Sequence, residues 1–460
     1  MYNENQILLN QYFLIKYICC NITETVSIPI LNIRNNHFTL RRKKMINQTN
    51  TLFVFVASVL VFFMTPGLAF FYGGMVSKKN AVNTMISVFM ITGVAIVLFI
   101  AFGYNLAFGK DVGGIFGLSK SVFLNGFDLK TLYSKDSGIT ILTYLMFQMM
   151  FSIITPALFV GAVVGRMKFK FLLAFVAIWS ILIYYPMVHM VWTPGGILAK
   201  KGMLDFAGGT VVHITAGITA LLLSIFVGPR IDFDPNGEVK HYNLPWVLMG
   251  TSILWIGWYG FNVGSALTVS DVATQAFLTT TVATGTSFVV WMFLDMFIKE
   301  KTTMIGLCTG ALCGLVGITP AAGYVTVAGA FAIGFICTLA SYGFIHVIKP
   351  KLKLDDPLDA FGCHGVSGIV GSILTGLFAT KIVNPQIENG LLYGGGLHLI
   401  TAQILGTLFT IIFVGIMTTI IVLLLKKIIP IRVSKEDELM GLDLAEHGEQ
   451  ADYGIEFEEK

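Results

Sequence analysis

The sequence has few charged residues. Aspartate, glutamate, lysine and arginine make up only 12% of its 460 residues, whereas soluble globular proteins carry about 25%. A soluble fold of this composition could not cover its surface with polar groups, but a fold embedded in a lipid bilayer does not need to. The net charge of +4 is small. Basic residues in the short loops between apolar segments indicate how the segments are oriented in a membrane. We therefore expect the lipid bilayer, and not a nucleic acid, as a partner.

Cysteine and proline are also scarce. The six cysteines lack the spacing of a zinc site or of a disulfide framework, so we interpret them as packing residues in an apolar phase. We expect no metal and no cofactor. Only 13 prolines stand against 48 glycines, and glycine suits helices that pack backbone to backbone in lipid. The cysteines are Cys19, Cys20, Cys308, Cys313, Cys337 and Cys363.

The sequence does have many long apolar stretches. A helix needs about 20 apolar residues to cross a bilayer, and eleven stretches come close to or exceed that length, the one at 303–319 being short and rich in glycine. We predict an all-α integral membrane protein with about eleven transmembrane helices. The predicted spans are 51–75, 81–108, 138–164, 171–191, 209–227, 244–266, 272–297, 303–319, 324–347, 361–380 and 395–425.

Lysine and arginine predict the orientation of these spans. The C-terminal tail and the loops on its side carry sixteen of them, and the opposite loops carry seven. Because cytoplasmic loops are enriched in positive charge, we place the tail in the cytoplasm and the start of the first span outside. We expect a plasma or inner membrane protein, with a transmembrane domain over 45–427 and a cytoplasmic regulatory tail over 428–460.

Residues 1–44 fit this orientation poorly. They end in four consecutive basic residues, 41–44, which would lie on the outer side. They have no clean apolar core followed by a small-residue cleavage site, so we predict no signal peptide. We hypothesise that translation begins at Met45 and that 1–44 is an N-terminal extension absent from the native protein. N-terminal sequencing of protein from the native host tests this, and intact residues 1–44 would contradict it.

The chain also reads as two related halves. Spans one to five and six to ten would have opposite orientations, because five is odd. Their fifth members contain similar sequences, 208–213 in the first half and 361–366 in the second. Inverted repeats usually form the transport site at their interface, near the middle of the membrane. We predict two inverted five-helix halves followed by a long eleventh helix.

Ionisable residues inside a span are costly and are candidates for function. Asp295 lies near the end of its span and could reach the membrane surface, as could several histidines near span ends. His213 and His364 differ, because they occupy matched positions in the two halves. Two facing imidazoles, uncharged because burial disfavours the charged form, could share a proton between their Nδ1 atoms and offer their outer nitrogens to a pore.

Acidic and aromatic residues accompany the histidines. Asp205 fits the N-cap of the helix that carries His213, and its charge would also favour a cation at the outer mouth. We expect Asp359 to cap the second histidine helix in the same way. A cation can also bind against aromatic faces; the candidates are Trp192, Phe151 and Phe261, with Ser265 as a hydroxyl acceptor.

These motifs together resemble the ammonium transporter family (Amt/Mep/Rh) from about residue 51 to 456. The combination is specific, although the first 44 residues have no counterpart in the family. The matching motifs are 65–74 (TPGLAFFYGG), 147–151, 189–192 (HMVW), 205–213 (DFAGGTVVH), 257–265 (GWYGFNVGS), 355–365 (DDPLDAFGCHG) and 441–448 (GLDLAEHG).

The resemblance implies a homotrimer with one pore in each subunit, and a mechanism. Ammonium would be recruited as a cation and lose a proton, and ammonia would cross an apolar pore. The tail would couple subunits and meet a PII-type signalling protein. The implied site residues are Trp192, Ser265, Phe151 and Asp205 for binding, Phe151 and Phe261 for the gate, and His213 and His364 for the pore pair.

Two other classes of function remain open. An ammonium sensor would signal through its tail with little flux. A large C-terminal sensory domain would support this function, but only about 33 residues follow the last span. An intramembrane enzyme could use the two histidines as metal ligands, but a third ligand at matching depth is missing. Methylammonium uptake separates a transporter from a sensor, and metal analysis tests for the enzyme.

Overall fold

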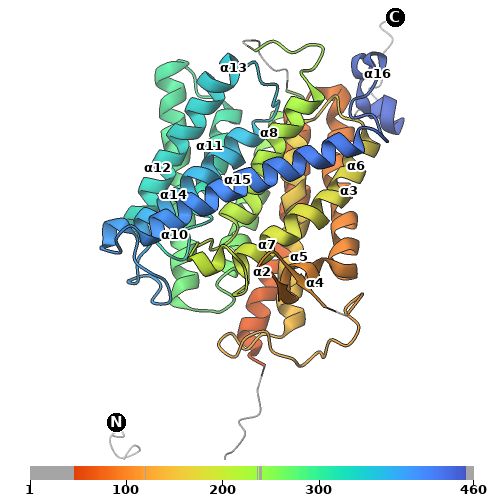
Figure 1. Cartoon of the computed structure of the whole chain (residues 1–460). Coiled ribbons are helices and arrows are strands. Elements are labelled where there is room, and N and C mark those ends of the chain that lie inside the picture. The colour runs from red at the N-terminus through yellow and green to blue at the C-terminus, as the bar shows by residue number, and fades with distance from the viewer. Residues whose placement is uncertain (1–45, 120, 236, 238–240, 452–460) are drawn as a thin grey trace, which may run out of the picture. The chain divides into compact units, whose positions relative to one another are not determined.

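The computed structural model describes residues 46–119, 121–235, 237 and 241–451 (Figure 1). The extension predicted over 1–44 lies outside these residues. The described chain is mainly helical, with one short antiparallel hairpin. The helices are α2 (Gln48–Met75), α3 (Ala81–Leu98), α4 (Tyr104–Phe108), α5 (Ile141–Leu158), α6 (Phe169–Trp179), α7 (Tyr185–Trp192), α8 (Thr215–Val227), α9 (Leu244–Trp258), α10 (Asp271–Ile298), α11 (Met304–Ile318), α12 (Val327–Gly343), α13 (Lys349–Lys351), α14 (Ser367–Phe378), α15 (His398–Leu425) and α16 (Lys435–Met440).

The apolar composition of these segments explains why they are helical. Within a bilayer no water can satisfy backbone N–H and C=O groups, so a lone segment must bond them internally. The first N–H groups of a helix still lack partners, and polar side chains just before the helix accept from them. Such side-chain caps come from Asn47, Thr140, Asn243, Ser270, Thr303, Thr326 and Ser434.

Nine helices in the described part of the chain are long and apolar enough to cross a membrane, and each matches a predicted span. The two remaining predicted spans are not among these nine. Span 244–266 is α9 followed by a π-helical turn, η7 (Tyr259–Val263), and span 303–319 is α11, which has 15 residues. The mainly helical, multi-pass architecture is confirmed, whereas the count of eleven crossings stays a prediction.

Several spans contain a π-helical segment that the sequence analysis did not predict. Two of these segments carry the paired histidines. His213 lies in η6 (Gly209–Ile214), which continues into α8, and His364 lies in η9 (Phe361–Val366), which continues into α14. Short π-helical segments are often associated with functional sites, so both histidine helices begin with an unusual local backbone.

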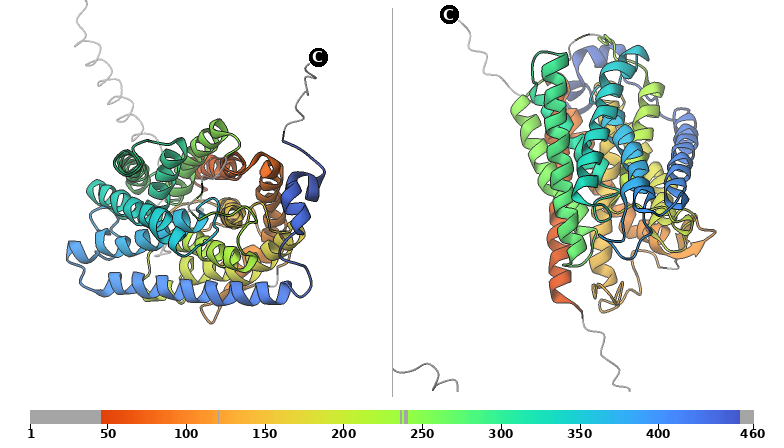
Figure 2. Two further views of the ribbon diagram at one scale, coloured as in Figure 1. Left: turned by 90° about the horizontal axis from the view of Figure 1, so that it is seen from above. Right: turned by 90° about the vertical axis from the view of Figure 1, so that its left-hand side faces the viewer.

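Burial separates inner from outer helices. Most residues of α5 are buried, whereas only a minority of the residues of α10 and α15 are. In Figure 2, α15 runs along one side of the bundle, and it contacts α14, α8 and α6. Large apolar side chains are exposed on α2, α3, α10 and α15, which suits a lipid environment. Examples are Leu52, Val56, Phe63, Phe89, Phe293, Leu405 and Ile412.

A small hairpin joins α4 to α5 and was not predicted. Strands β1 (Lys110–Val112) and β2 (Phe116–Leu118) pair antiparallel, with Lys110 opposite Leu118. Figure 1 shows this hairpin at the end of the bundle away from α16. We call that end the hairpin side, and the end that carries α16 the tail side.

The surroundings of two kinds of residue are clear. Asp295 is fully buried, and the Nζ of Lys299 comes to it at 3.2 Å. The reason is that Asp295 faces the start of α11, where the Thr303 hydroxyl donates to its carboxylate at 3.3 Å. The four cysteines within the described residues are buried and unpaired, in accord with a packing role.

Candidate functional site

Two phenylalanines stack in the interior of the bundle. Phe151 comes from α5 and Phe261 from η7, and their ring centroids lie 4.2 Å apart at 29° between planes. Both rings are buried. The turn that carries Phe261 packs directly on α2, because a Cβ at Gly260 would lie only 2.6 Å from the carbonyl oxygen of Ala57. The two residues expected to form a gate are therefore in contact.

Trp192 lies next to this pair, on its hairpin side. Its ring meets Phe151 edge to face, with centroids 5.7 Å apart at 87°. The indole Nε1–H donates to the backbone carbonyl of Asp205 at 3.0 Å, which fixes the ring at the end of α7. Edge-to-face contacts of this kind are favourable, and Trp192 as a whole is only half-buried.

Ser265 forms a hydrogen bond with only one of these three aromatic residues. It follows η7 by two residues, and its hydroxyl donates to the carbonyl of Phe261 at 2.8 Å. The oxygen of that hydroxyl keeps its acceptor capacity. The geometry thus links Ser265 to Phe261, while a contact with Trp192 or Phe151 stays a prediction.

The carboxylate of Asp205 caps the helix that carries His213. One oxygen accepts the N–H groups of Gly208 and Gly209, and the other accepts those of Thr210 and Val211, at 2.6–3.0 Å. Burial raises the pKa of Asp205 above its ordinary value, and the four backbone donors partly oppose this shift. The predicted N-cap is therefore present, and the negative charge of the Asp205 carboxylate faces the dipoles of these four backbone N–H groups.

The two histidines lie together. The rings of His213 and His364 are nearly parallel, at 9°, and their centroids are 5.3 Å apart. His213 also lies 5.9 Å from Phe261 and 5.3 Å from Trp258, centroid to centroid. Both histidines are buried.

The ring nitrogens of this pair are largely free of protein partners. Among the described residues, neither nitrogen of His213 and not Nδ1 of His364 has a hydrogen-bond partner. The shared proton that we expected between the two Nδ1 atoms is therefore not seen as a hydrogen bond. Buried polar atoms that lack protein partners need another partner such as a small solute. Within the described residues, no group of three or more histidine, cysteine, aspartate or glutamate side chains is arranged to hold a metal.

Close backbone contact brings the histidine helices together. A Cβ at Gly217 of α8 would overlap the backbone of Gly365, the neighbour of His364. Close approach through small residues is a common way for membrane helices to pack. An alanine at Gly217 would therefore displace η9 and the ring of His364.

The cap of the second histidine helix differs from the prediction. Asp356, and not Asp359, accepts the N–H groups of Ala360 and Phe361, at 3.1 and 2.8 Å. Asp359 lies in a left-handed turn with φ 54°, which directs its carboxylate to Lys349 instead. Burial raises the pKa of Asp356 to about 6.

A network of charges surrounds this cap on the tail side. Asp355 accepts from Arg230 through both oxygens, at 2.9 and 3.0 Å, and its backbone carbonyl accepts from Arg166 at 2.6 Å. Burial would raise the pKa of Asp355, but the charges of Arg166 and Arg230 lower it below its ordinary value. The carboxylates on this side are thus balanced by nearby cations.

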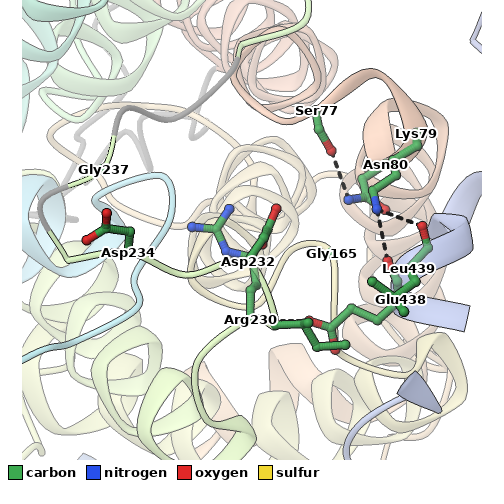
Figure 3. Close-up of a pocket in the computed structure, with 11 residues that line it drawn as sticks. Ser77, Lys79, Asn80, Gly165, Arg230, Asp232, Asp234, Gly237, Glu438 and Leu439 are labelled. Atoms are coloured by element: carbon green, nitrogen blue, oxygen red, sulfur yellow. Dashed lines mark hydrogen bonds between the residues drawn. The ribbon is translucent and has the colours of Figure 1, made fainter. Parts of the chain in front are cut away.

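The tail packs against the loops of the tail side. Figure 3 shows Lys79 between the two segments, with its Nζ donating to the carbonyls of Glu438 and Leu439 at 3.2 and 2.9 Å. Glu438 accepts from the backbone N–H of Ile231 at 2.8 Å and forms a bidentate pair with Arg432. A cavity of about 490 Å³ lies between the tail and the loops, and its lining includes Lys79, Ile231, Glu438 and Leu439.

One histidine outside the pair has a larger role than its position suggested. His189 is buried in α7, one turn before Trp192. Its Nδ1 lies 2.9 Å from the carbonyl of Ala107, and its Nε2 lies 2.9 Å from a carboxylate oxygen of Asp111 in β1. The hydrogen bond from His189 lowers the pKa of Asp111. The sequence offered no signal for this link between the hairpin and α7, because the partners are distant in the chain.

Comparisons with known proteins agree on one family. A model of the Ammonium Transporter Family matches residues 52–452. An ammonium transporter of Aquifex aeolicus is 43% identical over 419 residues, which cover 90% of this chain and 96% of that protein. The crystal structure of Candida albicans Mep2 superimposes with a TM-score of 0.80 at 32% identity, covering 89% of this chain and 91% of that chain. A structure titled Sensor Amt Protein has a TM-score of 0.78 at 31% identity, covering 87% and 98%.

Proposed function

This chain belongs to the ammonium transporter family, and on that premise we propose that it carries ammonium across a membrane through its own helix bundle. Ammonium binds as a cation at Trp192, Phe151 and Ser265 and then loses its proton. Neutral ammonia passes Phe261 and the pair of histidines. Asp205 stabilises the cation at the entrance through its charge.

One observation carries this proposal: an unbroken series of rings leads from Trp192 to His364. Successive centroids are 5.7 Å apart from Trp192 to Phe151, 4.2 Å to Phe261, 5.9 Å to His213 and 5.3 Å to His364. The first rings offer π faces that attract a cation. The last two offer unpaired nitrogens that can donate to or accept from ammonia.

The series also supports selection against potassium. Potassium and ammonium are similar in size and charge, so the entrance alone cannot separate them. A bare cation that passes the stacked phenylalanines loses its hydration, which costs several kcal/mol or more. Ammonium avoids this cost by leaving its proton behind, and potassium has no proton to leave.

We further propose the orientation, assembly and domain division that the sequence predicts. The tail side faces the cytoplasm, and the hairpin side faces outward. The transmembrane domain covers 45–427, and 428–460 is a regulatory tail. Three chains form a trimer with one pore each, and a PII-type signalling protein meets the tail side. The contacts of Lys79 with Glu438 and Leu439 support a tail whose position is coupled to the loops.

An ammonium sensor is the second candidate function. The likeness to the structure titled Sensor Amt Protein, and a tail docked on the loops, favour it. Methylammonium uptake in cells that lack other ammonium carriers separates the two. A transporter gives saturable uptake, whereas a sensor gives a tail-dependent signal with little flux.

The histidines provide the sharpest test. We expect His213→Ala and His364→Ala each to lower methylammonium uptake at least about tenfold, or about 1.4 kcal/mol. His398→Ala is the matched control, because His398 is exposed and pairs with the exposed Glu388. Excess potassium should compete little in the native protein. Uptake unchanged in both pore variants would refute the proposed pathway.

A further inference from the structure

Gln403 is a buried polar residue that the proposed pathway does not use. It lies near the start of α15, on the hairpin side, and its side chain is fully buried. A Cβ at Gly406, one turn on, would overlap the sulfur of Met203, so α15 packs tightly on the segment that leads to Asp205.

The amide of Gln403 pairs with the backbone of one residue, Leu204. Its Oε1 accepts the N–H of Leu204 at 2.7 Å, and its Nε2 donates to the carbonyl of Leu204 at 2.9 Å. The same Nε2 donates to the carbonyl of Ser372 in α14 at 2.9 Å. Both hydrogens and the oxygen of the amide are therefore engaged.

This pairing is needed because the segment around Leu204 has no regular structure. Residues 203–205 lie between a short 3-10 turn and η6, so neither a helix nor a strand bonds their backbone. Buried backbone groups without partners are costly, and a side chain from α15 supplies the partners here. The amide acts on Leu204 as a neighbouring strand would.

The residue held in this way adjoins the outer site. Asp205 follows Leu204 in the chain. The backbone carbonyl of Asp205 accepts a hydrogen bond from the indole of Trp192 at 3.0 Å, and the carboxylate of Asp205 caps η6. The amide of Gln403 also donates to the carbonyl of Ser372 in α14, the helix that follows the π-helical segment carrying His364. The side chain of Gln403 thus bonds the backbone of the segment that leads to the first histidine helix and the backbone of the second histidine helix.

We propose that Gln403 is a positioning residue of the outer ammonium site: through Leu204 it holds Asp205 and the ring of Trp192 in place. This inference rests on the proposed function, because it assigns Gln403 to the site where the cation is recruited. Gln403 touches no substrate. Its loss should weaken recruitment and leave the later steps nearly intact.

The test compares Gln403→Met with Thr407→Val by methylammonium uptake. The methionine keeps the length of the side chain and removes the hydrogen bonds of the amide. Thr407 lies one turn further along α15, and its hydroxyl donates to the hydroxyl of Ser372 at 3.1 Å; within the described residues it forms no hydrogen bond with Leu204. We expect Gln403→Met to raise KM about tenfold, or about 1.4 kcal/mol, with Vmax per folded protein changed less than about twofold, because the lost contact serves binding. Thr407→Val should leave both constants near their native values.

Further variants keep the outcomes distinct. If Gln403→Met fails to accumulate in the membrane, Gln403→Asn, which shortens the reach and keeps the amide, is measured in the same way and should also raise KM. An unchanged KM, or equal losses in the Gln403 and Thr407 variants, overturns the positioning role. Trp192→Leu is measured alongside. If it raises KM while Gln403 variants do not, this inference fails and the proposed function stands; if the native protein shows no saturable uptake, the proposed function itself fails.

Discussion

The two histidine helices begin in different electrostatic surroundings. Asp205 caps the first helix on the hairpin side through four backbone N–H groups, and no ion pair joins it to a lysine or arginine among the described residues. Asp356 caps the second on the tail side through two N–H groups. Its neighbours Asp355 and Asp359 pair with cationic side chains, which are Arg166, Arg230 and Lys349.

This difference fits a one-sided entrance for a cation. A carboxylate balanced only by backbone dipoles keeps part of its attraction for a mobile cation, whereas one paired with a fixed cation has little left. We therefore expect the hairpin side to attract ammonium more strongly than the tail side does. Three predictions test this comparison.

Asp205→Asn should have the largest effect. The amide keeps one acceptor oxygen, but it removes the charge and turns an N–H₂ group toward backbone donors. We expect methylammonium uptake per folded protein to fall about 100-fold, or about 2.7 kcal/mol, as measured by initial rates in cells. A fall of only about twofold would mean that Asp205 serves the fold alone.

Arg230→Gln should disturb the charge balance of the tail side. It removes the bidentate partner of the buried Asp355, while Arg166 stays nearby. Leaving a buried charge partly unpaired is destabilising, and because Arg230 is partly exposed and Arg166 remains, we expect about 2 kcal/mol. Thermal unfolding in detergent measures this, with Lys301→Gln, at an exposed position, as the control. KM should change little; a large rise would show that the tail side also recruits the cation.

Asp356→Asn should have the smallest effect. Asparagine is nearly as good an N-cap as aspartate, so uptake at neutral cytoplasmic pH should fall by about twofold or less. Because the pKa of Asp356 is raised to about 6, the native carboxyl gains a proton as the pH falls through that value. The native protein and the variant should then converge below pH 6. A ratio that widens as the cytoplasm is acidified would contradict the assigned cap.

The residues of the site could be predicted where sequence and geometry coincide. His213 and His364 occupy matched positions in two similar sequences, and the structure brings their rings within 5.3 Å. Asp205 precedes its helix by a spacing that suits a cap, and it forms one. Asp356 could not be chosen over Asp359, because both precede η9 and only the left-handed backbone at Asp359 turns its carboxylate away.

No comparable sequence pattern predicted the role of Gln403 or the link between His189 and Asp111. Gln403 lies in an apolar helix 199 residues from its partner Leu204. His189 looked like a residue at a helix end, and Asp111 like part of a loop. Contacts of this kind depend on which segments the fold brings together, which local patterns do not encode.

The sequence alone determined that this chain is a membrane-embedded helical protein with two matched histidines, since apolar length and residue spacing are local properties. The tertiary structure alone decided which carboxylate caps the second helix, how the rings line up from Trp192 to His364, and that Gln403 pairs with the backbone of Leu204. Those features arise from backbone turns and from contacts between distant segments, whose energies exist only once the helices have packed.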